Sequence, residues 1–232
     1  MKSLFGILIR PTRSKPTIYS LQFLLASLAI VALVIGCATT SGTKQADKVG
    51  DSFGDLRDEI VDLKQAVNES LAFLDQTVEQ ADKDPRKPYK DFSKSVDRVG
   101  KSREKVGKRA EDVKAAGAAY FKEWEKQLAE MNNPEIRAKA EERKQQLSET
   151  FGNFGPLVEQ TNSDFDAFYA DLKDLRAFLG HDLTVAGVDA AKDIINTTRE
   201  SGTKVDQSLD ELITEMNTIE AAITPSKAPP KK

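Results

Sequence analysis

Hydrophobic residues recur through most of the chain at alternating steps of three and four, with charged residues between them. This spacing puts the apolar side chains on one face of an α-helix and leaves the other faces to water. No segment shows the period of two that is typical of a half-buried strand. The pattern predicts four long helices, over residues 45–82, 89–131, 134–179 and 184–223.

The connections between these helices are short and contain residues that break or start helices. Pro85 and Pro88 follow the first helix, and each lacks a backbone N–H to donate. Asn133 is a suitable N-cap for the third helix, with Pro134 as its first helical residue. The sequence therefore predicts tight turns after residues 82 and 131.

The turn before the fourth helix has signals of its own. Gly180 is expected to end the third helix as a left-handed C-cap. Thr184 is expected to cap the fourth helix, with Leu183 and Val188 forming a hydrophobic staple around it. The fourth helix is then expected to continue without interruption to residue 223, before Pro225.

The third helix contains a run of breakers, Gly152 to Pro156, but its hydrophobic register continues through them. An irregular loop would be expected to reset that register. We therefore predict one helix kinked near Pro156, whose ring presses on the carbonyl of Gly152. The alternative is two helices with a break at residues 152–155.

Short turns make neighbouring helices antiparallel, and an apolar seam with a period near 3.5 residues favours coiled-coil-like packing. The predicted fold class is all-α, an elongated antiparallel four-helix bundle over residues 45–224. In an alternative arrangement the first helix packs against one neighbour and leaves a three-helix core. Residues 225–232 are expected to form a disordered cationic tail.

The N-terminal stretch has the pattern of a lipoprotein signal peptide. Four cationic residues and no acidic residue come before an apolar run. This run ends in Val34, Ile35, Gly36 and Cys37. This ending has the form of a lipobox, with the chain's only cysteine at its end. We predict that residues 1–36 are a signal peptide, that Cys37 is lipidated and that residues 37–44 form a linker. The alternatives are an uncleaved transmembrane anchor and an ordinary signal peptide.

Ala38 follows the predicted lipidated cysteine, where an aspartate tends to retain lipoproteins in the inner membrane. The resemblance to lipoproteins therefore implies an outer-membrane anchor that faces the periplasm, or the cell membrane in a host with a single membrane.

Composition narrows the function classes. Without residues 1–36 the chain has 30 Lys and Arg against 37 Asp and Glu, so a nucleic-acid partner is not expected. One histidine and one cysteine are too few for the usual zinc, haem or iron–sulfur sites, so we expect no metal and no cofactor. No HExxH, GxSxG or phosphate-loop motif is present, and we expect no catalytic residue and no enzyme activity.

Three local groups have both a structural and a functional interpretation. Tyr120, Phe121 and Trp124 are expected to pack at a bundle end, the alternative being an aromatic ligand pocket. His181 with Asp182 is expected to be a turn and cap, the alternative being a pH-sensing pair. The glycines within the helices permit close packing or leave room for a ligand, and a partner groove is conceivable beside Gly100, Gly107 and the polar seam position Arg103.

Two blocks resemble a family of bacterial helical lipoproteins that is known only as a domain of unknown function. They are AAYFKEWEKQLAEM, from Ala118, and FDAFYADLKDLRAFLGHDLTVA, from Phe165. The matching positions are Phe121, Glu123, Trp124, Leu179, His181, Asp182 and Leu183. Gly180 stands where a lysine looks commoner in that family. The resemblance implies a place in the cell envelope and brings no activity with it.

These observations together predict a non-enzymatic, membrane-anchored lipoprotein. Its bundle would serve as a periplasmic scaffold or protein-interaction module in cell-envelope maintenance, with an envelope protein as its partner. The alternative is a carrier or sensor that binds a lipid or another small ligand between the helices. A continuous cavity along the seam would favour the carrier, and a filled seam would favour the scaffold.

Overall fold

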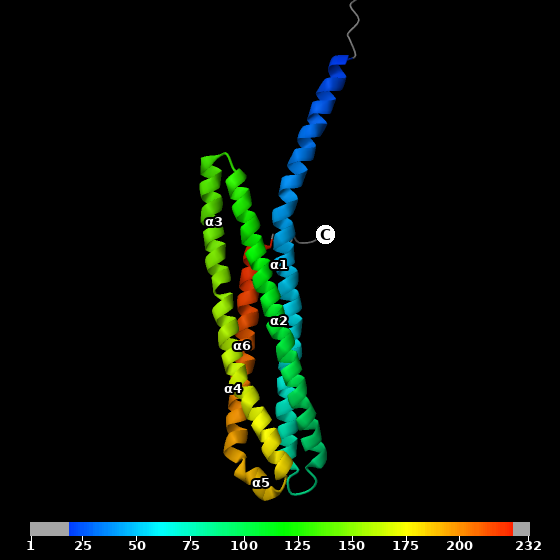
Figure 1. Cartoon of the computed structure of the whole chain (residues 1–232), viewed down its shortest axis with the longest axis vertical. Coiled ribbons are helices and arrows are strands. Elements are labelled where there is room, and N and C mark those ends of the chain that lie inside the picture. Colours follow the sequence, from blue (N-terminus) through cyan, green and yellow to red (C-terminus); the bar gives the residue numbers. More distant parts are fainter. Residues whose placement is uncertain (1–18, 225–232) are drawn as a thin grey trace, which may run out of the picture. The chain divides into compact units, whose positions relative to one another are not determined.

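The computed structural model describes the backbone of residues 19–224 and the side chains of residues 42–224. The regular structure of this part is entirely α-helical (Figure 1), which confirms the predicted all-α class. The chain divides into two units, residues 1–41 and 42–232, and the second unit is the helical bundle. The helices are α1 (Tyr19–Glu79), α2 (Arg86–Glu130), α3 (Pro134–Gly152), α4 (Phe154–His181), α5 (Val185–Ala190) and α6 (Lys192–Ile223).

Helix α1 begins well before the predicted start at residue 45, because no proline interrupts residues 19–79. Residues 37–44, expected to form a linker, are part of this helix. The start of the predicted signal peptide and the C-terminal tail at residues 225–232 lie outside the described residues. The removal of residues 1–36 is a processing step and stays a prediction.

Ion pairs between helices establish the topology of the bundle. In each neighbouring pair, residue numbers rise along one helix as they fall along the other, so all neighbours are antiparallel. Helix α1 pairs with both α2 and α6, which makes the core four-helical and excludes the three-helix alternative. The pairs are Glu69–Arg98, Asp55–Arg109, Arg57–Glu220, Asp75–Arg199, Asp97–Arg176, Glu125–Lys144 and Asp164–Lys204.

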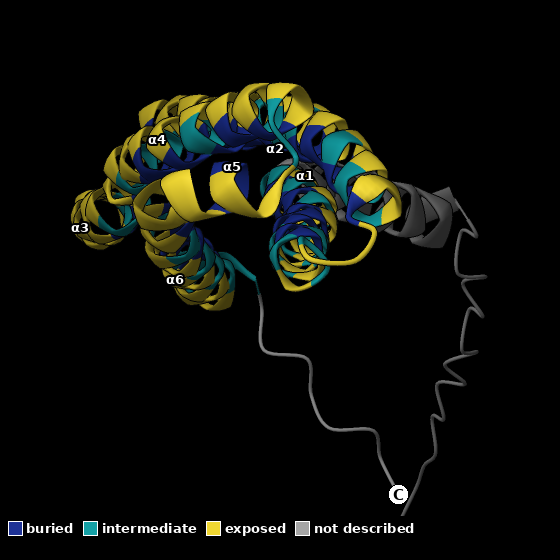
Figure 2. Cartoon of the chain, turned by 90° about the horizontal axis from the view of Figure 1, so that it is seen from below, coloured by how far each residue is buried: buried dark blue, intermediate teal, exposed yellow. Residues whose placement is uncertain are grey.

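The buried residues lie on the inward faces of the helices, and exposed residues cover the outside (Figure 2). Apart from Ile223, which is half-buried, the alternating steps of three and four in the sequence of α4 and α6 fall on buried core positions. These positions are Phe154, Val158, Thr161, Phe165, Phe168, Leu172, Leu175 and Leu179 in α4, and Ile195, Thr198, Gly202, Val205, Leu209, Leu212, Met216 and Ile219 in α6.

In the second half of the bundle part of α1, the sequence pattern is confirmed at Val67 and Leu74 but wrong at two positions between and after them. The sequence indicated Leu71 and Val78 as core positions, but Ser70 and Thr77 are fully buried and those two residues are half-buried. Because α1 has neighbours on two sides, it buries a stripe wider than a single seam. Small polar side chains fit at its centre, and the Thr77 hydroxyl donates a hydrogen bond to the carbonyl of Phe73, at 2.7 Å.

The predicted third helix is two helices, α3 and α4, so the alternative with a break is confirmed. They are separated by Asn153 alone, which keeps helical dihedral angles of φ −70° and ψ −24°. Pro156 lies in the first turn of α4, where a missing N–H costs no bond within that helix, whereas in a continuous helix it would leave the carbonyl of Gly152 unpaired. The helical geometry of Asn153 explains why the hydrophobic register passes through the break.

The predicted fourth helix is also divided, since α5 ends at Ala190 and α6 starts at Lys192. Helix α5 crosses the end of the bundle (Figure 2). The Thr184 N-cap is confirmed, because its hydroxyl accepts a hydrogen bond from the N–H of Gly187, at 3.1 Å. The predicted C-cap is wrong: Gly180 lies within α4, and the cap residue is Asp182, with an extended backbone at φ −135°.

Gly180 has a packing role instead. A Cβ at this position would lie 2.5 Å from the hydroxyl oxygen of Tyr89, on α2. The Tyr89 hydroxyl donates a hydrogen bond to the carbonyl of Arg176, at 2.9 Å. The glycine therefore makes room for a tyrosine that joins α2 to the last turns of α4.

The helices have unequal lengths at the end where the bundle part of α1 begins. Helix α6 ends near Gly50 of α1, where a Cβ would lie 3.8 Å from the methyl carbon of Thr224. Arg143 of α3 donates a hydrogen bond to the carbonyl of Ala222, at 3.0 Å. The α2–α3 hairpin therefore continues nine residues past the end of α6, about 13 Å at 1.5 Å per residue. Without α6 as a cover, the apolar residue Ile136 of α3 is 57% exposed.

Glycines in the seam are filled by side chains from neighbouring helices. A Cβ at Gly117 would lie 2.2 Å from the ring carbon Cζ of Phe151, and a Cβ at Gly202 would lie 2.8 Å from Cδ1 of Leu71. Both positions therefore hold the helices close together and leave no room for a ligand at these points.

Substitution of Gly117 by alanine is expected to destabilise the fold by about 1–3 kcal/mol, because the new methyl group collides with the buried ring of Phe151. Gly107→Ala is the matched control on the same helix, since nothing lies within 4 Å of its Cβ position. That control is expected to stabilise the fold by about 0.5–1 kcal/mol. Urea unfolding followed by circular dichroism measures both changes, and equal effects would contradict this account of the packing.

Candidate interaction surfaces

A buried carboxylate joins α4 to α6 near the middle of the bundle. The Asp164 side chain is 5% exposed, and one of its oxygens lies 2.7 Å from the ammonium of Lys204. The other oxygen accepts a hydrogen bond from the Ser208 hydroxyl, at 2.7 Å, and Gln160 donates to the first at 3.1 Å. The sequence pattern does not reveal this group, since Asp164 resembles the many solvated acidic residues around it.

The surroundings of Asp164 lower the pKa of its carboxyl group. Burial by itself raises that pKa, but the hydrogen bonds from Lys204, Ser208 and Gln160 outweigh it. A carboxylate with a lowered pKa in the folded state stabilises the fold above its unfolded pKa, and this contribution is lost as the pH falls through the folded pKa. The network is thus a connection between α4 and α6 that contributes less stability at acidic pH.

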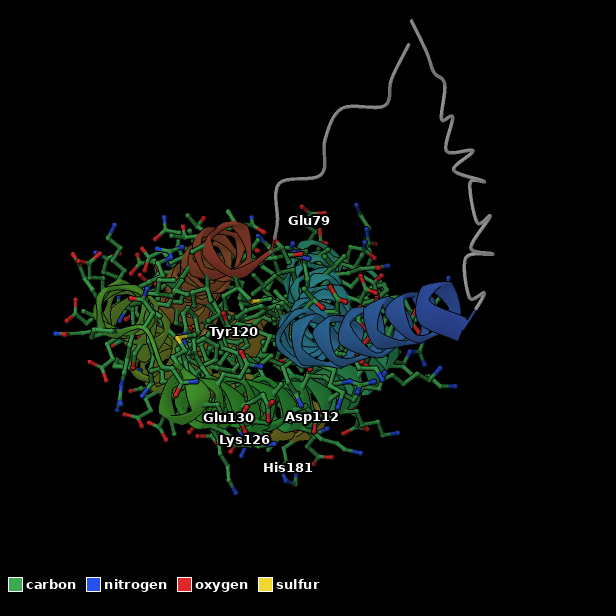
Figure 3. The ribbon with its side chains drawn as sticks, turned by 90° about the horizontal axis from the view of Figure 1, so that it is seen from above. Glu79, Asp112, Tyr120, Lys126, Glu130 and His181 are labelled. Atoms are coloured by element: carbon green, nitrogen blue, oxygen red, sulfur yellow. The ribbon has the colours of Figure 1, made fainter. Side chains whose placement is uncertain are left out.

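The aromatic residues singled out in the sequence form a packed cluster at the break between α3 and α4. We define the aromatic cluster by its members Phe53, Tyr120, Phe121, Trp124, Phe151 and Phe154. Ring centroids lie 5.3–6.2 Å apart, the separations of well-packed aromatic pairs. Tyr120 lies between the helices when the bundle is viewed from this end (Figure 3), and burial raises the pKa of its hydroxyl. The cluster accounts for these residues as core packing.

A small pocket lies on the side of this cluster that faces α1. Its volume is about 190 Å³, and Trp124 and Tyr120 form its apolar wall. Gly42, Glu123 and Gln127 complete the lining. The pocket is open to solvent in the stretch that α6 leaves uncovered.

The suggested groove is filled at Gly100, whereas nothing lies within 4 Å of a Cβ at Gly107. A Cβ at Gly100 would lie 2.3 Å from the hydroxyl oxygen of Tyr169, so this tyrosine fills the space. Arg103 forms an ion pair with Asp166 and lies 5.4 Å from the centroid of the Phe165 ring. Arg103, the polar residue in the seam of α2, therefore packs against α4.

The His181–Asp182 pair belongs to the turn that follows α4. The Asp182 carboxylate accepts hydrogen bonds from the hydroxyl and the N–H of Thr184, at 2.6 and 3.2 Å. The hydroxyl bond, followed by the backbone bond, holds the pKa of the Asp182 carboxyl below its usual range. The His181 side chain lies on the outside of the bundle (Figure 3). The predicted turn and cap interpretation agrees with these contacts.

An apolar groove lies at the end of the bundle formed by α5. We call it the distal groove, and its volume is about 330 Å³. Its apolar lining includes Val78 in the last turn of α1, Ala81 just after that helix, and Val185, which is 56% exposed. Ile194, 49% exposed, follows on α6. The sequence pattern did not single out these residues as a surface, because their exposure depends on the break at Ala191.

A wider, polar groove runs along the outside of the α2–α3 hairpin. Its volume is about 580 Å³, and ion pairs cross or line it. Lys144 lies 2.5 Å from the Glu125 carboxylate, and Arg137 lies 3.6 Å from that of Glu141. Because these positive and negative side chains are paired, the groove has no strong excess of either charge.

The predicted lipobox residues Val34, Ile35, Gly36 and Cys37 lie within the backbone of α1, and their side chains are outside the described ones. Lipidation of Cys37 stays a prediction. In the part of the chain with described side chains, no three His, Cys, Asp or Glu residues gather in a way that would hold a metal ion. No helix among the described residues is long and apolar enough to cross a membrane.

The geometry of the described part defines a class of protein: an antiparallel helical bundle whose seam is filled at Gly117 and Gly202 and whose grooves lie on its surface. A family model described as a protein of unknown function (DUF2959) matches residues 37–227. The chain belongs to this family, which confirms the resemblance to an uncharacterised family. Comparisons with curated proteins and with solved structures found no match.

The residues that carry the resemblance have structural roles in this chain. Phe121 and Trp124 belong to the aromatic cluster. Leu179 is fully buried, and Asp182 organises the turn through Thr184. These motifs therefore specify the fold at two places.

Replacement of Asp164 by alanine is expected to cost about 1–3 kcal/mol at pH 7, since Ser208 and Gln160 lose their acceptor. The loss should shrink as the pH falls below about 4, because protonation weakens the same contacts in the wild type. Asp166→Ala is the matched control, with a side chain that is 62% exposed, and it should cost less than about 1 kcal/mol. Urea unfolding at pH 7 and pH 3.5 measures the stability of both variants. A loss of stability for Asp164→Ala that is the same at both pH values would contradict this role of the carboxylate.

Proposed function

We propose that this protein is a membrane-anchored lipoprotein whose helical bundle works as a non-enzymatic scaffold or protein-interaction module in cell-envelope maintenance. Cys37 is its lipidated first residue after removal of residues 1–36. The bundle projects into the periplasm from the outer membrane, or outward from the cell membrane in a host with a single membrane. Its partner is an envelope protein.

The filled seam carries the proposal of a scaffold. The two seam glycines that would leave space for a ligand, Gly117 and Gly202, are occupied by the side chains of Phe151 and Leu71. The aromatic cluster closes the core at the α3–α4 break. The grooves of 330 and 580 Å³ lie instead on the surface, where another protein has access to them. This arrangement favours a binding surface over a carrier with a ligand between the helices.

The position of the family match supports the anchor. The matched region begins at Cys37. The apolar segment and the cationic residues before it therefore lie outside the part shared with the family model, as a removable signal would. Ala38 in place of an aspartate favours the outer membrane.

Cys37→Ala is expected to abolish lipidation, because the thiol is the only cysteine sulfur in the chain. Cells fed an alkyne fatty acid should label the wild type and leave the variant unlabelled. Intact-mass measurement should find the wild type starting at Cys37 with acyl groups attached, and the variant uncleaved.

The two alternatives for the N-terminus give different results in the same experiment. An ordinary signal peptide would give an unlabelled, shortened wild type. A transmembrane anchor would give an unlabelled wild type of full length. Either result would contradict the lipoprotein proposal.

The scaffold is tested against the carrier with the same pair of proteins. In-cell crosslinking followed by purification should capture one defined envelope protein with the lipidated wild type, and lose it with Cys37→Ala. Native mass spectrometry of the purified wild type should show no added small molecule beyond the acyl chains. A stoichiometric bound compound without a captured protein would replace the scaffold with the carrier.

A further inference from the structure

The α2–α3 hairpin extends toward the end of the bundle at which Gly42 lies, five residues after the predicted lipidated Cys37. We define the hairpin tip as residues 126–139, which includes the turn from Met131 to Asn133. Residues 132–139 are all exposed, and Ile136 is one of the most exposed large apolar residues among those described. Helix α6 does not reach this level, so within the bundle the tip contacts other helices only at its base.

The contact between Gly42 and Gln127 fixes the tip relative to the start of the bundle. A Cβ at Gly42 would lie 3.6 Å from Nε2 of Gln127, and both residues line the 190 Å³ pocket. Met131 follows Gln127 by four helical residues, about 6 Å along α2. The turn of the tip therefore lies beyond the level of Gly42, on the side away from α6.

Chain length then limits how far the tip is from the membrane. Cys37 precedes Gly42 by five residues, which span at most about 18 Å even when fully extended. A Cys37 that carries acyl chains in the bilayer holds Gly42 within that distance of the headgroups. The turn of the tip extends about 6 Å into this interval, so it lies at most about 12 Å from the headgroups and reaches them when residues 37–42 span about 6 Å or less.

The charge distribution fits the same contact. The tip has Lys126, Arg137 and Lys139 against Glu130 and Glu135. The rest of the chain from Cys37 onward has 27 Lys and Arg against 35 Asp and Glu. An anionic membrane surface therefore repels the tip less than the remainder of the bundle.

We propose that the hairpin tip is a second membrane contact, which rests on the lipid headgroup surface with Ile136 and the uncharged turn as its contact residues. This inference rests on the proposed lipidation of Cys37. Two separate contacts, the acyl chains and the tip, fix the tilt of the bundle. They hold the distal groove away from the membrane, roughly 65 Å from the tip along α3 and α4.

A single fluorophore at the tip tests this contact in the full lipidated chain. With Cys37 blocked by its acyl group, Ile136→Cys provides the only free thiol, and Val185→Cys is the matched control at the opposite end. The two parent residues are 57% and 56% exposed, so a label at either position should leave the core intact. The labelled proteins are reconstituted in vesicles of phosphatidylethanolamine and phosphatidylglycerol that contain a lipid with a nitroxide on its headgroup.

The label at position 136 is expected to be quenched at least about threefold more strongly than the label at position 185. A label at Asn132 of the turn repeats the test independently of Ile136, and circular dichroism verifies that each variant is folded. Flotation with the vesicles reports the lipid anchor separately. If the proteins float but both labels are quenched equally, the tip contact is overturned and the anchor remains. A tip that binds a protein partner instead of lipid would give this result. If the purified wild type carries no acyl groups and fails to float, the proposed function itself is overturned.

Discussion

Close packing of large side chains against glycines on neighbouring helices is the contact on which the bundle depends. Phe151 lies against Gly117, Leu71 against Gly202 and Tyr89 against Gly180, so three different helix pairs use the same device. A glycine within a helix costs about 1 kcal/mol relative to alanine, and each of these contacts offsets that cost by burying a large side chain. Space that looks available for a ligand in the sequence is thereby used for packing.

The end of α6 is the second feature with wide consequences. Because α6 stops beside Gly50 and Arg143, the α2–α3 hairpin continues without a cover. The bundle thus has two different ends, one with a projecting polar hairpin and one closed by α5 and the distal groove. This asymmetry suits a protein that is held at one end and binds at the other, and it is the link between the fold and the proposed function.

Acidic residues contribute to the fold according to their burial. The exposed ion pairs that connect the helices are each worth little in water, though together they favour the antiparallel register. Asp164 differs because its side chain is buried and hydrogen-bonded by Lys204, Ser208 and Gln160. It is a charged group in the contact between α4 and α6, where the other buried polar residues are uncharged.

The amino-acid sequence by itself determined the helical class, the antiparallel order, the Thr184 cap and the register of α4 and α6, because periodicity and capping are local properties of a chain. It also carries the pattern from which lipidation of Cys37 is predicted, and such a pattern is read without reference to a fold. The tertiary structure alone decided the burial of Ser70 in place of Leu71, the exposure of Ile136, the role of Gly180 and the network around Asp164. Each of these depends on which neighbour lies opposite and where that neighbour ends, and neither is encoded in the period of a single helix.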